Sequence, residues 1–362
     1  MVMDPFEYAH KHNVVWMAQN TNLLPTTPKI KEAVIKSLNE EEYNNYPYKK
    51  GIFGLKEAVL NDLGLQDFDA ILTGGGTEAL YIIMRAMLKD GDEVITSDPS
   101  YFIIHHFIET SKGIPTDLPI YNPPWKYTVE QINEAVNRKT KMILLIDPIN
   151  PLGTGYSRDE VKVICEIAND NNLFILNDIT YRDFADSHTL TSEFAPEKTI
   201  IAYSVSKNCG MAGMRTGALV APLELMHGMR VFNTNDLSIN VLGQRAALAA
   251  LETKNEWMPK VKKITRNNQK IIKKCVDKTD GVFLPVYPSQ ANMFLIDIGE
   301  RNIKPEELQN KLLYEHNIFV RAGNYVSKSF GDRFIRTSFS IPEEGVKKFV
   351  DVFPDVVEEL GK

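Results

Sequence analysis

The chain has 362 residues, of which 43% are hydrophobic and 24% are charged, and its formal net charge is -6. A single hydrophobic core rarely extends beyond about 250 to 300 residues, so this length predicts two domains. The ordinary composition and weak negative charge argue against a nucleic-acid-binding protein and against a membrane protein.

The N-terminal segment and the cysteines indicate the compartment. Residues 1–20 carry acids and histidines where a signal peptide needs a basic start and an apolar run. Cys165, Cys209 and Cys275 are odd in number, widely spaced and without a C-x-x-C pair, which argues against a disulfide framework and a zinc site. We therefore expect a cytoplasmic protein with no metal centre.

Between residues 70 and 220, short apolar runs alternate with longer amphipathic stretches. This alternation predicts an α/β fold, in which helices cover a mostly parallel sheet. Ligands of such sheets gather at the carboxyl ends of the strands, so the residues that follow each apolar run are the candidates for function. The runs include DAIL (69–72), DEVITS (92–97), KMILLID (141–147), LFILND (173–178), TIIAYSV (199–205) and TGALVAP (216–222).

The last third of the chain changes character. A lysine-rich helical stretch at 255–279 precedes the strand-like run ANMFLIDIG, a helix near 304–316, the segment RFIRTSFS and a closing amphipathic helix. This succession predicts a smaller α+β domain. Since no Pro/Gly-rich tract interrupts the chain, we expect a continuous helix to join the two domains.

The segment ILTGGGTEAL (71–80) combines an apolar run, three glycines and the start of a helix, a pattern that can hold a phosphate group. Gly74, Gly76 and Ala79 satisfy the G-x-G-x-x-G/A pattern of dinucleotide-binding proteins, and Asp98 lies about 20 residues further on, where an acid that binds ribose is expected. The loop alone is therefore compatible with a dehydrogenase.

Two later strand ends carry polar residues in an unusual arrangement. Asp178 ends the run LFILND, and Tyr181 follows it closely. The run TIIAYSV leads into the segment Ser204-Val205-Ser206-Lys207, and Arg215 lies eight residues after the lysine. A lysine at a strand end among small residues suggests a reactive amine. For each residue alone, a helix-capping aspartate and a solvated lysine are the structural alternatives.

Taken together, these segments resemble the class I/II aminotransferases, fold-type I enzymes that depend on pyridoxal 5'-phosphate (PLP). The resemblance covers nearly the whole chain and extends to both the aspartate and the histidinol-phosphate aminotransferase branches. It implies a large PLP-binding domain, with a mostly parallel sheet of the seven-stranded type between helices, and a smaller α+β domain.

We expect residues 1–40 to form an N-terminal arm and part of the small domain, residues 41–245 the large domain and residues 246–362 the C-terminal small domain. The matching motifs are Gly75-Gly76-Thr77, Asp98-Pro99-Ser100-Tyr101, Asn150-Pro151-Leu152-Gly153, Asp178 with Tyr181, the S-x-S-K segment at 204–207 with Arg215, and Arg336 in FIRTSFS.

The resemblance assigns five side chains to the cofactor ring. Lys207 would hold the cofactor as a Schiff base and then act as the base that moves the proton from the substrate Cα, while Asp178 would pair with the pyridine nitrogen. Asn150 and Tyr181 would donate hydrogen bonds to the phenolate oxygen, and Tyr101 would stack on the ring. The alternatives are a turn asparagine and two core tyrosines. Lys207, Asp178 and Tyr181 are the expected catalytic residues.

The cofactor phosphate would lie at the start of the helix that follows the glycines. Backbone N–H groups of Gly76 and Thr77, in the turn that begins at Gly75, would bind it with the support of the helix dipole. Arg215 would add a bidentate charge-assisted pair. Glu78 is an objection, because an acid beside a phosphate repels it unless its side chain points away. The remaining phosphate ligands would be the hydroxyl groups of Ser204 and Ser206.

Tyr46 lies five residues before Gly51 in the segment YPYKKG. This resembles the family segment in which a tyrosine reaches the cofactor phosphate of the neighbouring subunit. The resemblance implies a homodimer with shared active sites. A surface tyrosine is the alternative.

Arg336 would bind the α-carboxylate of the substrate through two parallel hydrogen bonds, with Asn150 and Asn22 nearby. Every amino acid carries this carboxylate, so the motif does not select the substrate. A dicarboxylate or phosphorylated substrate needs a second cation. The candidates for it are Lys49, Lys50, Arg321 and Lys328.

The expected activity is a ping-pong transfer of the α-amino group from an L-amino acid to a 2-oxo acid through a pyridoxamine phosphate form. A PLP-dependent β-lyase or amino-acid decarboxylase is the alternative, because the same residues serve those reactions and the pose of the substrate decides which bond breaks. A non-catalytic binding module or regulator on this fold is a further alternative, but a pseudoenzyme would be expected to have lost Lys207 or Asp178, and both are present. A dehydrogenase would not explain Lys207, Asp178, Tyr181 and Arg215.

Overall fold

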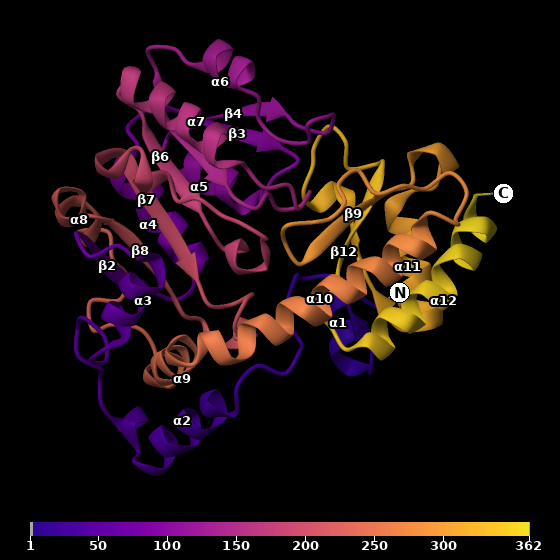
Figure 1. Cartoon of the computed structure of the whole chain (residues 1–362), viewed down its shortest axis with the longest axis horizontal. Helices are drawn as coiled ribbons and strands as arrows, with labels where there is room; N and C mark the ends of the chain where they lie inside the picture. The colour runs from indigo at the N-terminus through magenta and orange to yellow at the C-terminus, as the bar shows by residue number, and fades with distance from the viewer. Residues whose placement is uncertain (1–2, 362) are drawn as a thin grey trace.

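The computed structural model describes residues 3–361 and consists of two lobes, which Figure 1 shows side by side. Helix α10 (Lys254–Val276) runs from the larger lobe to the smaller one. The prediction that a continuous helix joins the two parts is therefore confirmed. Within residues 3–361, none of the helices has the combination of length and apolar character that a membrane span requires.

A seven-stranded sheet forms the centre of the larger lobe, with the strand order β2-β8-β7-β6-β5-β3-β4. Neighbouring strands are parallel except at β8, which is antiparallel to both β2 and β7. This confirms the predicted α/β fold with a mostly parallel sheet. The strands are β2 (Phe68–Thr73), β3 (Glu93–Asp98), β4 (Ile114–Pro119), β5 (Thr140–Ile146), β6 (Phe174–Asp178), β7 (Thr199–Ser204) and β8 (Gly217–Pro222).

Strand β4 was not among the predicted strands. It lies at the edge of the sheet, contains Pro115 and Pro119, and exposes three of its six residues. Proline cannot donate a hydrogen bond to a sheet ladder and is confined to edge strands. An edge strand of this kind lacks the continuous apolar run by which the central strands are recognised.

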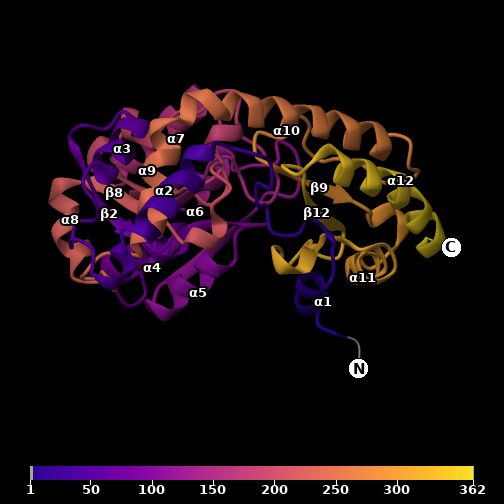
Figure 2. The ribbon, with the colours of Figure 1, turned by 90° about the horizontal axis from the view of Figure 1, so that it is seen from below.

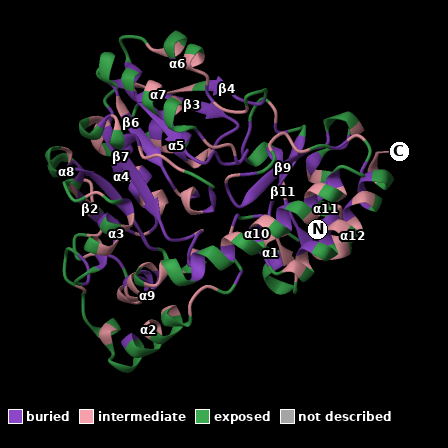
Figure 3. Ribbon diagram, viewed as in Figure 1, coloured by how far each residue is buried: buried purple, intermediate pink, exposed green. Residues whose placement is uncertain are grey.

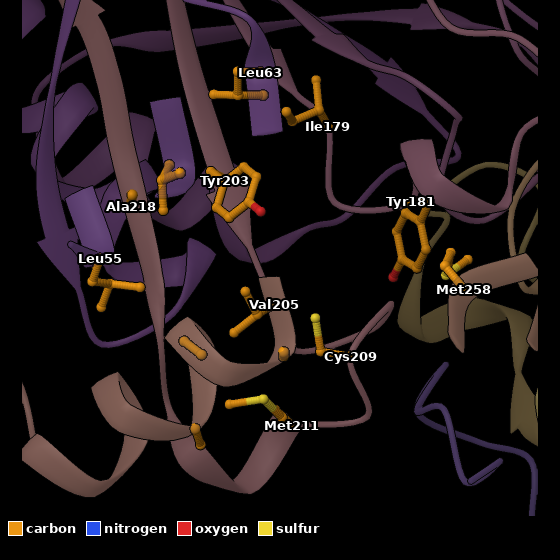
Figure 4. Close-up of a cluster of buried hydrophobic side chains, with 14 of the residues drawn as sticks. Leu55, Leu63, Ile179, Tyr181, Tyr203, Val205, Cys209, Met211, Ala218 and Met258 are labelled. Carbon is orange, nitrogen blue, oxygen red and sulfur yellow. The ribbon is translucent and has the colours of Figure 1, made fainter. Parts of the chain in front are cut away.

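Helices cover both faces of the sheet because the central strands are apolar on both sides. Met142 and Leu144 of β5 belong to the cluster under α4, α5 and α8, whereas Ile143 and Leu145 belong to the cluster under α6 and α7. Figure 4 shows part of a third cluster, with Tyr203 and Ala218 on neighbouring strands beside Leu55 of α3. The helices are α3 (Leu55–Leu63), α4 (Gly76–Met87), α5 (Ile103–Thr110), α6 (Val129–Ala135), α7 (Arg158–Asp170), α8 (Leu223–Arg230) and α9 (Val241–Glu252).

The smaller lobe has an antiparallel sheet in the order β11-β12-β9, built from β9 (Met293–Asp297), β11 (Arg321–Ala322) and β12 (Phe334–Ser338). Helices α11 (Pro305–His316) and α12 (Glu343–Leu360) pack on it. In α12 the buried residues recur every three or four positions, as in Val346, Phe349 and Phe353, and so form one apolar face. The burial map of Figure 3 shows the buried strands of both lobes inside partly exposed helices.

Residues 3–40 contact both lobes. Strand β1 (Val15–Trp16) pairs with β10 (Ile318–Phe319) of the smaller lobe, and α1 (Pro5–Lys11) lies near α11. Helix α2 (Pro28–Asn39) packs against α9 of the larger lobe, as the view in Figure 2 also shows. We propose that this segment is the arm expected at 1–40, and that the two lobes correspond to the domains expected at 41–245 and 246–362.

Candidate active site

A cavity of about 460 Å³ lies where the carboxyl ends of the parallel strands meet the smaller lobe. Its volume is within the usual range for a small-molecule site. Most of the predicted site residues line it, although they come from segments far apart in the sequence. These are Gly76, Thr77, Tyr101, Asn150, Asp178, Tyr181, Ser204, Ser206, Lys207, Arg215 and Arg336.

Parallel pairing brings the two most informative strand ends together. Asp178 is the last residue of β6, and Ser204 is the last residue of β7, which pairs with β6 in parallel register. Lys207 follows three residues after Ser204 and lines the cavity. The carboxylate and the amine therefore share one edge of the sheet, as expected for ligand-binding residues of such folds.

The amine of Lys207 is perturbed by its surroundings. Its Nζ donates a hydrogen bond to the carbonyl oxygen of Gln19 at 2.9 Å. Burial, together with the guanidinium groups of Arg336 and Arg215, lowers the pKa of the amine from 10.5 to about 8. A lysine with such a pKa is neutral in part near physiological pH, which a nucleophilic or basic amine requires.

Asp178 is 5% exposed and is held by its neighbour Thr180. The backbone N–H and the hydroxyl group of Thr180 both donate to Oδ1, at 3.1 and 2.6 Å. Burial raises the pKa of the Asp178 carboxyl, and the two hydrogen bonds act in the opposite direction. A cationic group of a ligand would stabilise the ionised carboxylate further.

Two tyrosine hydroxyl groups lie at the cavity. The Tyr181 hydroxyl accepts a hydrogen bond from Nδ2 of Asn20 at 3.1 Å, and the Tyr101 hydroxyl lies 3.4 Å from Oγ1 of Thr77. Burial raises the pKa of both hydroxyl groups above their ordinary value. Both tyrosines therefore stay protonated at neutral pH and can donate to a ligand.

Arg336 is 4% exposed and is oriented by two hydrogen bonds. Its Nη1 donates to Oδ1 of Asn150 at 3.1 Å, and its Nη2 donates to the carbonyl oxygen of Ala18 at 2.8 Å. Its Nε has no hydrogen-bond partner within the described chain. Burial lowers the pKa of this guanidinium group. A buried cation without a carboxylate partner favours an anionic ligand.

The glycine turn forms the start of α4. Gly75 caps the helix with φ of +99°, a conformation that L side chains rarely adopt. Nη2 of Arg215 donates to the carbonyl oxygen of Gly74 at 3.0 Å, which fixes the guanidinium group beside the helix N-terminus. The side chain of Glu78 accepts hydrogen bonds from Thr234, Asn235 and the N–H of Gly74 and does not line the cavity. The acid is therefore turned away from the anion site.

Three predicted residues do not line the cavity. Gly75 is the N-cap residue of α4 and lies in the turn before the lining residue Gly76. Asn22 is buried, with its amide donating to the Asn208 carbonyl and its oxygen accepting from Leu24 N, so the structure does not bring it to the substrate side. Tyr46 is 81% exposed and lies outside the cavity of its own chain.

Several lining residues were not predicted as site residues. Gln19 comes from the N-terminal arm, and Thr180 lies between the catalytic candidates Asp178 and Tyr181. Arg321 was one of four candidate cations, and the structure places it in the cavity wall, whereas Lys49, Lys50 and Lys328 do not line the cavity. The guanidinium carbon of Arg321 lies 3.9 Å from the ring centroid of Tyr325 and 4.7 Å from that of Phe6.

The sequence matches the family description "Aminotransferase class I and II" over residues 12–353. It is 28% identical over 332 residues to an aspartate aminotransferase of Pyrococcus horikoshii, covering 88% of this chain and 84% of that protein. It is 27% identical over 355 residues to histidinol-phosphate aminotransferase 2 of Carboxydothermus hydrogenoformans, covering 96% and 92%.

Solved structures share the fold. The structure of Thermus thermophilus aspartate aminotransferase with maleate superposes with a TM-score of 0.84 and 23% identity, covering 97% of this chain and 94% of that chain. For N-succinyldiaminopimelate aminotransferase from Mycobacterium tuberculosis the TM-score is 0.87 and the identity 19%, with coverage of 97% and 95%. The α/β fold and the fold-type I architecture are thus confirmed.

These relatives are named as aminotransferases, and they do not favour the β-lyase or decarboxylase alternative. The dehydrogenase interpretation of the glycine loop is likewise replaced, because the loop forms the start of α4 at a cavity with an amine, a carboxylate and three guanidinium groups. The chain belongs to the class I and II aminotransferase family and is an enzyme of amino-group transfer.

Proposed function

We propose that this aminotransferase uses pyridoxal 5'-phosphate to move the α-amino group of an L-amino acid to a 2-oxo acid. The observation that carries this proposal is the meeting of three groups in one cavity. They are the amine of Lys207 with a lowered pKa, the buried carboxylate of Asp178 and the N-terminus of α4 beside Arg215. A phosphorylated pyridine aldehyde requires these three kinds of partner.

The free donors at the helix N-terminus fit a phosphate group. The first N–H groups of an α-helix have no partner inside the helix, so those of Gly76 and Thr77 can bind an anion. Arg215 supplies a fixed cation there, and Glu78 is turned away. The hydroxyl groups of Ser204 and Ser206 line the same end of the cavity.

The opposite end of the cofactor would meet Asp178, whose ionised carboxylate would pair with a protonated pyridine nitrogen. Tyr181 and Asn150 would hold the phenolate oxygen, and the Tyr101 ring would lie against the cofactor ring. When bound, the cofactor supplies an electron sink for the carbanion that forms when the substrate Cα loses its proton.

Lys207 has two tasks in this proposal. Its amine would attach the cofactor and, once the substrate amine has released it, would carry the proton from the substrate Cα to the cofactor carbon C4' on the same face. Both tasks require the neutral amine, which burial and the neighbouring Arg336 and Arg215 favour. The Gln19 carbonyl oxygen orients the amine by accepting its hydrogen bond.

Arg336 would bind the substrate α-carboxylate through charge-assisted hydrogen bonds. A third guanidinium group in the cavity wall, that of Arg321, contacts two aromatic rings instead of a carboxylate. We propose that it binds a second acidic group, so that the preferred amino donor is doubly anionic. Burial lowers the pKa of Arg321, which a bound anion would reverse.

A homodimer with shared sites is part of the proposal. Tyr46, Tyr48 and Phe53 form an exposed aromatic surface, with exposed fractions of 81%, 50% and 86%. Such a surface suits contact with a second copy of the chain, and Tyr46 would then reach the partner's cofactor phosphate.

We also propose a cytoplasmic location, on the argument that three widely spaced free thiols suit a reducing compartment.

The test is a half-reaction. When holoenzyme is mixed with an amino donor and no acceptor, each site should turn over a single time and the visible absorption of the cofactor should be lost. Addition of a 2-oxo acid should restore this absorption. Lys207→Ala should lose the visible absorption of the attached cofactor and at least about 1000-fold of the turnover. Release of ammonia and pyruvate without an acceptor, or an unchanged spectrum in Lys207→Ala, would contradict the proposal.

A further inference from the structure

We propose that Asp98 is a positioning residue for the substrate end of the site. Its carboxylate anchors the small-lobe loop Gly323–Gly331 to the carboxyl end of β3, and this loop carries Tyr325 into the cavity wall. The inference rests on the proposed function, because it concerns the same substrate pocket. Asp98 itself does not line the cavity.

Both carboxylate oxygens of Asp98 are bonded to the other lobe. The Ser327 hydroxyl donates to Oδ1 at 2.5 Å, and the Ser329 backbone N–H donates to Oδ2 at 2.9 Å. The backbone N–H of Ser100 donates to the carbonyl oxygen of Val326 at 2.8 Å, which adds a second bond between the same two segments. Asp98 is only 5% exposed, so these bonds form away from bulk water.

The anchored loop is closed at its base. A Cβ atom at Gly323 would lie 2.4 Å from the carbonyl oxygen of Gly331, and one at Gly331 would lie 2.5 Å from Cα of Asn324. Inside the loop, the N–H groups of Val326 and Ser327 donate to the Gly323 carbonyl oxygen at 2.9 and 3.1 Å. A loop that is closed in this way moves as a unit, so an anchor at Ser327 and Ser329 sets the orientation of the whole loop.

Tyr325 connects the loop to the proposed substrate contacts. Its ring lies 3.9 Å from the guanidinium carbon of Arg321, and both residues line the cavity. A cation held against an aromatic face has a restricted direction. The position of the loop therefore sets where the Arg321 guanidinium meets a distal acidic group of the substrate.

This arrangement also explains the acid that follows β3. In the dinucleotide interpretation Asp98 would bind a ribose, yet its carboxylate faces the small lobe and not the glycine turn. Tyr101, three residues later, lines the cavity. One short segment thus presents a ring to the cofactor side and fixes the loop on the substrate side.

The test uses Asp98→Asn in the holoenzyme. The amide keeps the shape of the carboxylate but has one acceptor oxygen, so one of the two bonds is lost and the charge is removed. The KM for the preferred amino donor should rise about tenfold, while kcat changes less than about twofold and cofactor content is unchanged. Hydrogen exchange of the 323–331 amides should become faster.

Two further variants separate positioning from stability. Ser327→Ala removes one donor and should raise the KM in the same direction by a smaller factor, which keeps the test valid if Asp98→Asn folds poorly. Tyr121→Phe removes a bond between the same lobes, since the Tyr121 hydroxyl donates to Oδ2 of Asp297 at 2.6 Å, but it leaves the Asp98 anchor intact. It should lower thermal stability without changing the KM.

A double variant tests the route through Arg321. In an Arg321→Gln background, Asp98→Asn should add little to the KM, because the group that the loop positions is already absent. The inference is overturned if the effects of the two substitutions on the KM are additive. It is also overturned if Asp98→Asn leaves the KM or the hydrogen exchange of the loop unchanged, or if it lowers kcat and cofactor content equally. If the wild type has no preference for acidic donors, the proposed substrate class fails, and the anchor is then judged by exchange and by the KM of the best donor.

Discussion

The carbonyl oxygen of Gln19 accepts a hydrogen bond from Nζ of Lys207 at 2.9 Å, although the two residues are 188 positions apart in the sequence. The N-terminal arm thus reaches the amine that is expected to hold the cofactor. The same amine has its pKa lowered to about 8 by burial and by two guanidinium groups. This combination makes the reactivity of the amine measurable as a function of pH.

The rate at which cofactor-free protein binds PLP covalently should rise with pH and level off above about pH 8. The sign follows from the shift: the amine is protonated and unreactive below its pKa, and neutral above it. Arg336→Leu removes the cation with the largest effect on this pKa and should move the midpoint upward. Arg158→Leu, an exposed arginine paired with Glu193, is the control and should not move it. A midpoint near the ordinary lysine value in the wild type would contradict this expectation.

Arg336→Lys should raise the KM of every α-amino acid donor. Two parallel hydrogen bonds to the carboxylate become a single contact, and the bonds to Asn150 and Ala18 that orient the guanidinium group are lost. The loss of one charge-assisted hydrogen bond corresponds to about 10-fold to 100-fold in KM. Steady-state kinetics with several donors checks this, and cofactor absorption should stay unchanged. Equal KM values for wild type and variant would remove Arg336 from the carboxylate site.

Arg321→Gln should discriminate between donors. Donors with a second acidic group should lose about tenfold in kcat/KM, whereas alanine should change little. Lys328→Gln is the matched control, because Lys328 belongs to the neighbouring loop but lies over the Phe102 ring and does not line the cavity. If both variants lose activity equally for all donors, the second cation is not where we propose it.

Sequence reasoning predicted the residues whose position follows directly from the chain. A strand end fixes where its next residue points, so the apolar runs marked Asp178, Lys207 and the glycine turn as candidates, and the family resemblance supplied their roles. Arg336 needed the family motif, because a β-strand arginine is otherwise an ordinary residue. The structure brings all of these to one cavity.

The remaining lining residues could not be predicted, since they depend on tertiary contacts between distant segments. Gln19 contributes a backbone carbonyl, which has no sequence signal, and Asn20 rather than Asn22 faces the Tyr181 hydroxyl. Two asparagines in QNTN are equivalent in sequence, and only the path of the arm between the lobes distinguishes them. The same holds for Arg321, which was one of four candidate cations until the fold placed it beside Tyr325.

Gly75→Ala should weaken cofactor binding. The residue has φ of +99°, and a Cβ atom would lie 2.8 Å from Nη2 of Arg215, so the change strains the turn and displaces the cation. The Kd for PLP should rise about tenfold, as measured by titration of cofactor-free protein. Gly64→Ala is the control: Gly64 also has positive φ, +69°, but nothing lies within 4 Å of its Cβ position. Gly64→Ala should lower the stability of the protein and leave the Kd for PLP unchanged. An equal rise of the Kd in both variants would point to general destabilisation.

Mixing Tyr46→Ala with Lys207→Ala should restore activity that neither variant has alone. In a mixed dimer, one site combines Lys207 of the first chain with Tyr46 of the second and is therefore complete, whereas the other site lacks both. The exposed position of Tyr46 in its own chain is the reason to expect this exchange. The measurement is transaminase activity after unfolding and refolding the two variants together, compared with each variant refolded alone. Because half of the randomly formed dimers are mixed and each has one complete site, the gain should approach about one quarter of the wild-type activity at equal protein concentration. Activity no higher than the mean of the parents, in a sample in which mixed dimers are shown to have formed, would show that each chain builds its site alone.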